Sequence, residues 1–294
     1  MNSFSISQLQ QYSGIKAHTI RIWEQRYDAL QPHRSEGNTR YYDNSQLRRL
    51  LNIVSLIGAG HKVSDLCKMT DEKLFRILDE QLKNNLPKDE ASEHFTTQLI
   101  AAGITFDEGH FEKIFSHCLL RFGIKNTYTR VIYPLLLRIG LMWANDTIAP
   151  AQEHFITNML RQKIFSAIDA LPPPKSSANS WLLFLPENEF HEIGLLFSYY
   201  LIRQAGKKAI YLGSNLPLAT LEATIKQISP AHLLFFLVHQ NMPEEIQSYL
   251  RFLKKKFRNT KIHLAGNEKL IRHLKTGKEI NWIQSVDELE RHVS

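Results

Sequence analysis

The sequence contains little cysteine and no long apolar run, and these two absences exclude several classes of protein. Cys67 and Cys118 are the only cysteines among 294 residues. They cannot build a disulfide framework, and their separation does not suit a zinc site. No apolar run approaches the roughly 20 residues that a membrane span needs. The first residues also lack the basic and then apolar pattern of a signal peptide. We therefore expect a cytoplasmic protein that makes no membrane contact.

The composition is that of a globular protein with an uneven distribution of charge. The hydrophobic fraction is 43% and the charged fraction 22%, which are ordinary values. A chain of this length can form two or three domains. The net charge is +7, and residues 1–68 hold nine lysines and arginines against five acids. This excess is a weak indication of an anionic partner.

The first segment has the pattern of two short helices around a glycine turn. Ser5 and Gln8 form a capping-box pattern that opens a helix, and we expect that helix to end at Ser13, before Gly14. A second helix is expected over about Ala17–Tyr27. Two short helices about such a turn make a helix-turn-helix.

A hairpin and a third helix are expected next. Gly37-Asn38 lies in the middle of residues 32–42 and has the chemistry of a tight hairpin turn. Helical periodicity then resumes at about Ser45 and ends at Gly58. The ordered string Thr19–Tyr27, followed by Arg40-Tyr41-Tyr42, resembles the MerR family of winged helix-turn-helix regulators. The alternative is a small basic helical domain in which Trp23 and Tyr27 are simply core, and we expect Trp23 to be core in either case.

The MerR resemblance implies a dimer that binds a palindromic double-stranded DNA operator. The second helices would enter successive major grooves, and the wings would contact the backbone. Arginine side chains suit guanine edges or phosphates, and phosphate contacts add affinity without sequence information. The residues expected to contact DNA are His18, Thr19, Arg21, Arg26, Tyr27, Arg40 and Tyr41.

The remaining sequence predicts a helical bundle followed by a parallel sheet. Between about residues 71 and 171, apolar residues recur with helical spacing, which predicts four helices, and residues 84–92 resemble a hinge. No long heptad pattern is evident. After the linker at residues 172–177, strand-like and helical stretches alternate, which predicts a parallel sheet covered on both faces. The fold class is therefore multidomain α and α/β. The expected domains are 1–75 (winged helix-turn-helix), 90–172 (bundle) and 179–294 (Rossmann-like).

His191 lies in the loop after the first expected strand, where ligands of such sheets bind. The pattern Glu189-x-His191-x-x-Gly194, with Ser214-x-Leu216 later, resembles the cobalamin-binding Rossmann-like domain. Glutamate replaces the aspartate of that family's motif, and a later glycine pair is only half present as Ala265-Gly266. The resemblance implies that His191 is the lower axial ligand of cobalt and that the acid holds its other ring nitrogen. The cofactor-binding residues that it implies in this segment are Glu189, His191, Glu192, Gly194, Ser214, Leu216 and Gly266.

A second motif lies in the expected bundle. Trp143 is followed after nine residues by Glu153-His154, a spacing that resembles adenosylcobalamin-dependent, light-sensing MerR regulators. In them the bundle caps the upper face of the corrin, with the tryptophan and the Glu-His pair around the adenosyl group. These regulators carry a histidine directly after the tryptophan, which can bind cobalt after photolysis. Ala144 occupies that place here and has no ligand atom.

Together the two resemblances predict a cobalamin-dependent, light-responsive MerR-type repressor that is not an enzyme. Adenosylcobalamin would set its state of assembly, dimer or tetramer, and through it DNA binding. One alternative is a regulator that has lost cobalamin dependence and uses its sheet domain as an oligomerisation or partner-binding scaffold. A corrinoid methyl carrier or mutase subunit and a metal-sensing regulator are less favoured. The first has no use for a DNA-binding head, and the second lacks a close cysteine pair.

Overall fold

The computed structural model describes residues 4–35, 37–58, 61–74, 76–77, 88–144, 148–174, 176–238 and 243–293. The chain divides into two compact units, residues 1–156 and residues 157–294. Across these described ranges, no helix has the length and apolarity needed to cross a membrane. The two cysteines are free and buried.

The first unit begins with the expected helix-turn-helix. Ser5 caps the first helix by accepting from the backbone N–H of Gln8 at 3.3 Å, and Gln8 accepts from Ser5 in return. Gly14 ends that helix in the left-handed region, with φ +73°, a conformation that glycine adopts without strain. The helical elements of this part are α1 (Ile6–Ser13), α2 (Ala17–Tyr27), α3 (Asn44–Gly58) and α4 (Val63–Leu66).

The predicted wing is confirmed as a two-stranded hairpin. β1 (His33–Arg34) pairs antiparallel with β2 (Arg40–Tyr41). Asn38 in the connecting turn has φ +59°, which asparagine tolerates better than most residues. Phe4, ahead of α1, bridges to Tyr42 directly after β2, so the wing is tied to the start of the head.

In the helical part that follows, two long helices are joined without a loop, which the sequence did not predict. Its elements are α6 (Lys88–Ile104), α7 (Glu108–Thr127), the π-helix η1 (Tyr128–Ile132), α8 (Tyr133–Ala144) and α9 (Pro150–Asp169). α7 bends at Gly123, with φ +68°, and then continues through η1 into α8 without a loop. The predicted hinge is wrong at Lys88–Ser92, which begins α6; residues 84–87 lie outside the described residues. The apolar residues whose spacing predicted the bundle are buried from Phe95 to Ile139, except Leu136, which is half-buried.

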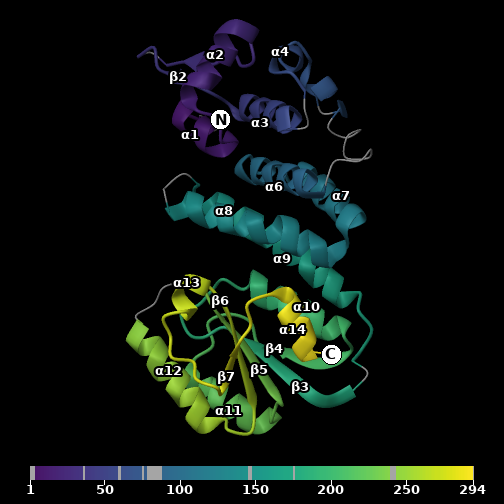
Figure 1. Ribbon diagram of the computed structural model, residues 1–294, viewed down its shortest axis with the longest axis vertical. Helices are drawn as coiled ribbons and strands as arrows, with labels where there is room; N and C mark the ends of the chain where they lie inside the picture. The colour runs from purple at the N-terminus through teal and green to yellow at the C-terminus, as the bar shows by residue number, and fades with distance from the viewer. Residues whose placement is uncertain are drawn as a thin grey trace. The chain divides into compact units, whose positions relative to one another are not determined.

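The second unit is a five-stranded, fully parallel sheet covered on both faces (Figure 1). The strand order is β4-β3-β5-β6-β7. The large core cluster joins one face of the sheet to α11, α12 and α13, and α10 and α14 pack on the other face. The strands are β3 (Ser176–Phe184), β4 (Lys207–Tyr211), β5 (His232–Leu237), β6 (Lys261–Gly266) and β7 (Ile280–Trp282). The helices are α10 (Ile193–Gln204), α11 (Leu218–Ile228), α12 (Pro243–Lys256), α13 (Glu268–Ile271) and α14 (Val286–Val293).

The alternation of strands and helices is confirmed, with three differences at its ends. β3 begins at Ser176, so the predicted linker ends two residues too late. The last of the alternating helical stretches, residues 268–276, contains only one turn of helix, since α13 ends at Ile271. α14 at the end of the chain was not predicted. Its apolar face consists of few residues, among them the buried Leu289 and Val293.

Candidate cofactor site and DNA interface

The candidate cofactor site lies where the winding of the sheet reverses. From β3 the chain crosses to β4 on one side, and β5 lies on the other side of β3. In such sheets ligands bind outside the carboxyl ends of the strands at this switch point. The loop after β3 extends the pairing with the loop after β4, because Leu185 donates its N–H to the carbonyl of Gly213 at 2.8 Å and Pro186 bridges to Leu216.

Glu189 is the buried centre of this edge, with 2% of its surface exposed. Its Oε1 accepts from the backbone N–H groups of Phe190 and His191, both at 3.0 Å. Its Oε2 accepts from the backbone N–H of Val238, the residue after β5, at 2.8 Å. One carboxylate therefore fixes its own loop and joins it to the neighbouring strand.

The same carboxylate orients the imidazole of His191. Nδ1 of His191 lies 2.7 Å from Oε1 of Glu189, and the histidine side chain is 54% exposed. A carboxylate on one ring nitrogen fixes the tautomer and the ring orientation, so that Nε2 offers its lone pair to a metal. The structure thus brings together the two residues that the sequence motif pairs, in the arrangement of an oriented metal ligand.

Glu192 lies in the same loop, but its carboxylate contacts other protein groups. Tyr211 donates its hydroxyl to Oε2 of Glu192 at 2.8 Å, and the Arg161 guanidinium lies 2.6 Å from Oε1. Burial, together with this acceptor, raises the pKa of Tyr211 well above its usual range. Glu192 therefore positions the start of α10 against α9 and β4. A bound cofactor would contact a Glu192 carboxylate that is already paired with Tyr211 and Arg161.

The loop after β4 reaches the same edge of the sheet. Ser214 is half-buried there, and Leu216 packs partly buried against the core. Asn215 connects the two loops, because its N–H donates to the carbonyl of Glu189 at 3.1 Å and its Oδ1 accepts from the N–H of Asn188 at 2.9 Å. Sequence reasoning missed Asn188 and Asn215; both have positive φ, 64° and 57°, which asparagine adopts more readily than most residues.

Both glycines of the motif allow close packing within the protein. Gly194 lies in the first turn of α10, where a Cβ would come within 2.7 Å of the Phe236 ring on β5. Gly266, at the end of β6, has φ +129°, and a Cβ there would lie 2.1 Å from the carbonyl oxygen of Leu237. Gly194 thus allows α10 to pack closely on the sheet. Gly266 allows the chain to pass close to the Leu237 carbonyl as it leaves β6.

The second motif lies on two helices of the first unit, at the end of α8 and at the start of α9. Trp143 is near the end of α8 and is 52% exposed, although it is a large apolar side chain. Glu153 and His154 lie in the first turn of α9, where His154 Nδ1 is 3.0 Å from Glu153 Oε2. The His154 side chain is 70% exposed. An exposed tryptophan at the end of one helix and an exposed imidazole in the first turn of another suit contact with a ligand.

The candidate DNA interface is the outer side of α2 together with the wing. His18, Arg21 and Arg26 on α2 are exposed, and so is Tyr41 on the wing. Thr19, Tyr27 and Arg40, which were also expected to contact DNA, are half-buried. Trp23, expected to be core, is only half-buried. Exposed cations on a helix and a neighbouring hairpin can contact a DNA groove and its flanking phosphates.

Glu24 positions the wing against α2 and was missed by sequence reasoning. It accepts a hydrogen bond from the Tyr42 hydroxyl at 2.5 Å, and the Arg40 guanidinium lies 3.6 Å from it. Burial, with this hydrogen bond, raises the pKa of Tyr42 above its usual range. Since α2 and the wing are both expected on DNA, this pair of contacts fixes the spacing between two contact surfaces.

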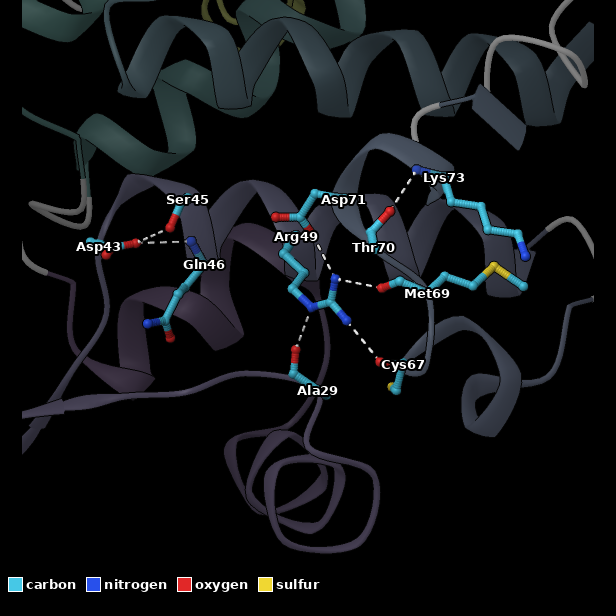
Figure 2. Close-up of polar contacts among 10 residues, drawn as sticks. All are labelled: Ala29, Asp43, Ser45, Gln46, Arg49, Cys67, Met69, Thr70, Asp71 and Lys73. Carbon is cyan, nitrogen blue, oxygen red and sulfur yellow. Dashed lines mark hydrogen bonds and ion pairs between the residues drawn. The ribbon is translucent and has the colours of Figure 1, made fainter.

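Arg49 joins several segments of the DNA-binding head by hydrogen bonds within the fold, as Figure 2 shows. Its guanidinium donates to the carbonyls of Ala29 at 2.8 Å, Cys67 at 2.8 Å and Met69 at 3.0 Å, and to the carboxylate of Asp71 at 2.5 Å. The charge of Arg49 is therefore neutralised inside the fold. It contributes little to the basic surface that the charge count of residues 1–68 suggested.

Comparison with known proteins matches the head of the chain and the helical part that follows it. Residues 4–73 match the MerR HTH family regulatory protein, and residues 96–166 match the B12 binding domain. The chain is 24% identical to the HTH-type transcriptional repressor CarH of Myxococcus xanthus, over 95% of this chain and 97% of that protein. It is 25% identical to the repressor CarA of the same organism, over 83% and 80%. Among solved structures, the monomethylamine corrinoid protein of Methanosarcina barkeri shares the fold, with TM-score 0.55 and 13% identity over 68% of this chain and 97% of that one.

Proposed function

Because this chain joins a MerR-type DNA-binding head to a B12 binding domain, we propose that it is a cobalamin-dependent transcriptional repressor. The observation that carries the proposal is the buried carboxylate of Glu189 on Nδ1 of His191, at 2.7 Å. This partner would leave Nε2 of His191 available to bind the cobalt of a cobalamin. The similarity to two repressors over most of the chain supports the regulatory role.

We propose adenosylcobalamin as the bound form and light as the signal. Bound cobalamin would supply a cobalt centre with an upper carbon ligand that light can release. Trp143, Glu153 and His154 are the proposed contacts of that upper ligand, supported by the exposure of Trp143 and His154. Ala144 follows Trp143 and cannot supply an imidazole, so no second histidine ligand comes from that position.

The proposed effect on DNA passes through assembly of the protein. Dimers or tetramers would place paired α2 helices on a palindromic operator in the dark. Loss of the upper ligand would favour a different arrangement of Trp143 and its helix, and thereby a different assembly. A ligand shifts such an equilibrium only by its differential affinity for the two states. The protein acts in this proposal as a switch and not as an enzyme.

The test is an absorption spectrum combined with a DNA-binding assay. Purified protein is incubated with adenosylcobalamin in the dark and desalted, and its spectrum is recorded before and after green light. The protein should retain the corrinoid, His191→Ala should lose the histidine-ligated character, and His273→Ala, which changes an exposed histidine of the same unit, should keep it. DNA binding should require the corrinoid and weaken after illumination.

Two outcomes would contradict the proposal. A protein that retains no corrinoid would be a DNA-binding protein whose sheet domain serves as a scaffold. Full DNA binding in the dark without any corrinoid would separate the two parts functionally.

A further inference from the structure

Besides the excess in residues 1–68, the chain carries a second and larger excess of positive charge in its sheet unit. Residues 1–156 hold 18 lysines and arginines and 17 acids, whereas residues 157–294 hold 18 and 12. Within the second unit, residues 251–279 alone hold ten lysines and arginines and two glutamates. A cofactor site at the other end of the sheet does not account for this concentration.

Six of these ten cations line one groove of the sheet unit, with a volume of about 720 Å³. The groove lies at the amino ends of β6 and β7, whereas His191 follows the carboxyl end of β3. It is formed by the last turns of α12, the turn into β6 and the start of β7. Its charged lining residues are Arg251, Lys254, Lys255, Arg258, Lys261, Lys278 and Glu279.

Most of these charges are not neutralised within the protein. Lys254 lies 3.5 Å from Glu279, and Arg251 donates to the hydroxyl of Ser248 at 3.0 Å. In the described part of the chain, no acid lies within ion-pair distance of the remaining four lining cations, Lys255, Arg258, Lys261 and Lys278. Several like charges around one groove repel each other unless an anion is bound.

A purely structural explanation covers only part of the cluster. Lysines in the last turn of a helix interact favourably with its dipole, which accounts for Lys254 and Lys255 at the end of α12. It does not account for Arg258 and Lys261, which follow the helix, or for Lys278, which comes from another part of the chain. Three segments that bring cations to one groove indicate a ligand with several negative charges.

We infer that this groove binds the phosphate backbone of double-stranded DNA outside the sequence that the head reads. The inference rests on the DNA binding of the proposed function. A nucleotide is disfavoured because the aromatic residue of the lining, Phe257, is buried (7% exposed) and offers no stacking surface for a base. Exposed lysines and arginines suit phosphates without reading sequence. DNA held by the head would also be present at high effective concentration.

The test is the salt dependence of DNA binding by the full-length protein. Affinity for a labelled 40-bp duplex of random sequence is measured from low to moderate salt for the triple variant Lys255→Gln, Arg258→Gln, Lys261→Gln. Log affinity falls with log salt, and each lost phosphate contact lowers the magnitude of this slope by about 0.9. Three lost contacts should therefore lower it by about 2.7. The matched control removes three exposed cations outside the groove: Lys208→Gln, Lys226→Gln, Arg291→Gln.

The control should leave the slope within about one contact of the wild-type value. Both triple variants should keep the wild-type corrin spectrum and thermal unfolding, which shows that they fold. A groove variant with the wild-type slope would overturn the inference and leave the proposed function intact. So would a groove variant that loses binding of inorganic tripolyphosphate while its DNA slope is unchanged, since that points to a free phosphorylated ligand. Failure of the wild-type protein to bind any duplex would contradict the proposed function as well.

Discussion

Replacing Glu189 should damage both the fold of the sheet unit and its cobalamin site. The carboxylate accepts four hydrogen bonds, from three backbone N–H groups and from Nδ1 of His191, at 2.7–3.0 Å. It is 2% exposed, so Glu189→Ala leaves these donors without their acceptor. An unpaired buried donor costs about 1–3 kcal/mol. Because water can reach some of them, we expect a total loss of about 3–5 kcal/mol, the range for breaking a buried charged network.

The effect on the cofactor should be separable from the effect on the fold. Loss of the hydrogen-bond partner that orients a metal ligand typically lowers the affinity for the metal 10–100-fold. Glu189→Gln keeps the shape and one acceptor oxygen, so it should fold with a smaller loss of stability. It should still bind adenosylcobalamin at least about 10-fold more weakly, because His191 loses its anionic partner. Glu187→Gln changes an exposed acid of the same loop and should match the wild type.

Two assays decide the matter. Urea unfolding measures the loss of stability, and titration with adenosylcobalamin in the dark, followed by absorption, measures affinity and histidine ligation. If Glu189→Ala unfolded at the wild-type urea concentration and bound cobalamin with wild-type affinity, the carboxylate would hold neither the loop nor the imidazole. The reasoning from its four hydrogen bonds would then be refuted.

Three further predictions concern other parts of the chain. Arg49→Ala removes the donor shared by three carbonyls and should lower the free energy of unfolding of the head by about 3 kcal/mol; a loss below about 1 kcal/mol in a denaturant melt would be too small for this role. Gly266→Ala places a Cβ 2.1 Å from the Leu237 carbonyl oxygen at φ +129°, so it should cost at least about 1–3 kcal/mol and weaken cobalamin retention, and a wild-type melting temperature would argue against it. Burial lowers the pKa of His232 to about 4 and of His263 to about 3, so both stay neutral in the folded state and stability is complete above pH 6.5. It should fall as the pH drops from 6.5 towards 4, by up to about 1.4 kcal/mol per pH unit for each histidine, and a flat urea midpoint between pH 7 and pH 5 would contradict this.

Local sequence signals predicted the elements whose stabilising contacts are local. The second helix was expected over Ala17–Tyr27 and has those bounds. The capping box at Ser5 and Gln8 and the hairpin turn at Gly37-Asn38 also formed as predicted. In each case, the residues that stabilise the element lie within a few positions of each other, so the pattern in the chain already contains the interaction.

The roles that depend on distant partners could not be predicted from such patterns. Arg49 is one cation among nine in residues 1–68, and nothing adjacent to it indicates that it binds carbonyls about twenty residues away on either side. The link from Glu189 to Val238 spans 49 residues, so the motif predicted the pairing with His191 but not the connection to β5. Likewise, the continuous passage of α7 through η1 into α8 could not be predicted, because Gly123 and Pro134 are local signals of a break between helices.

The contacts of Arg49 also determine how the head can be studied as a separate fragment. Two of the carbonyls that it binds, and the carboxylate that completes the set, belong to residues 67–71, after α4. A fragment cut at the end of the third helix would contain the DNA-contacting residues but leave the guanidinium inside the fold with only the Ala29 carbonyl to bind. The shortest independently folding head should therefore extend at least through Asp71, and expression of nested fragments would find its boundary there.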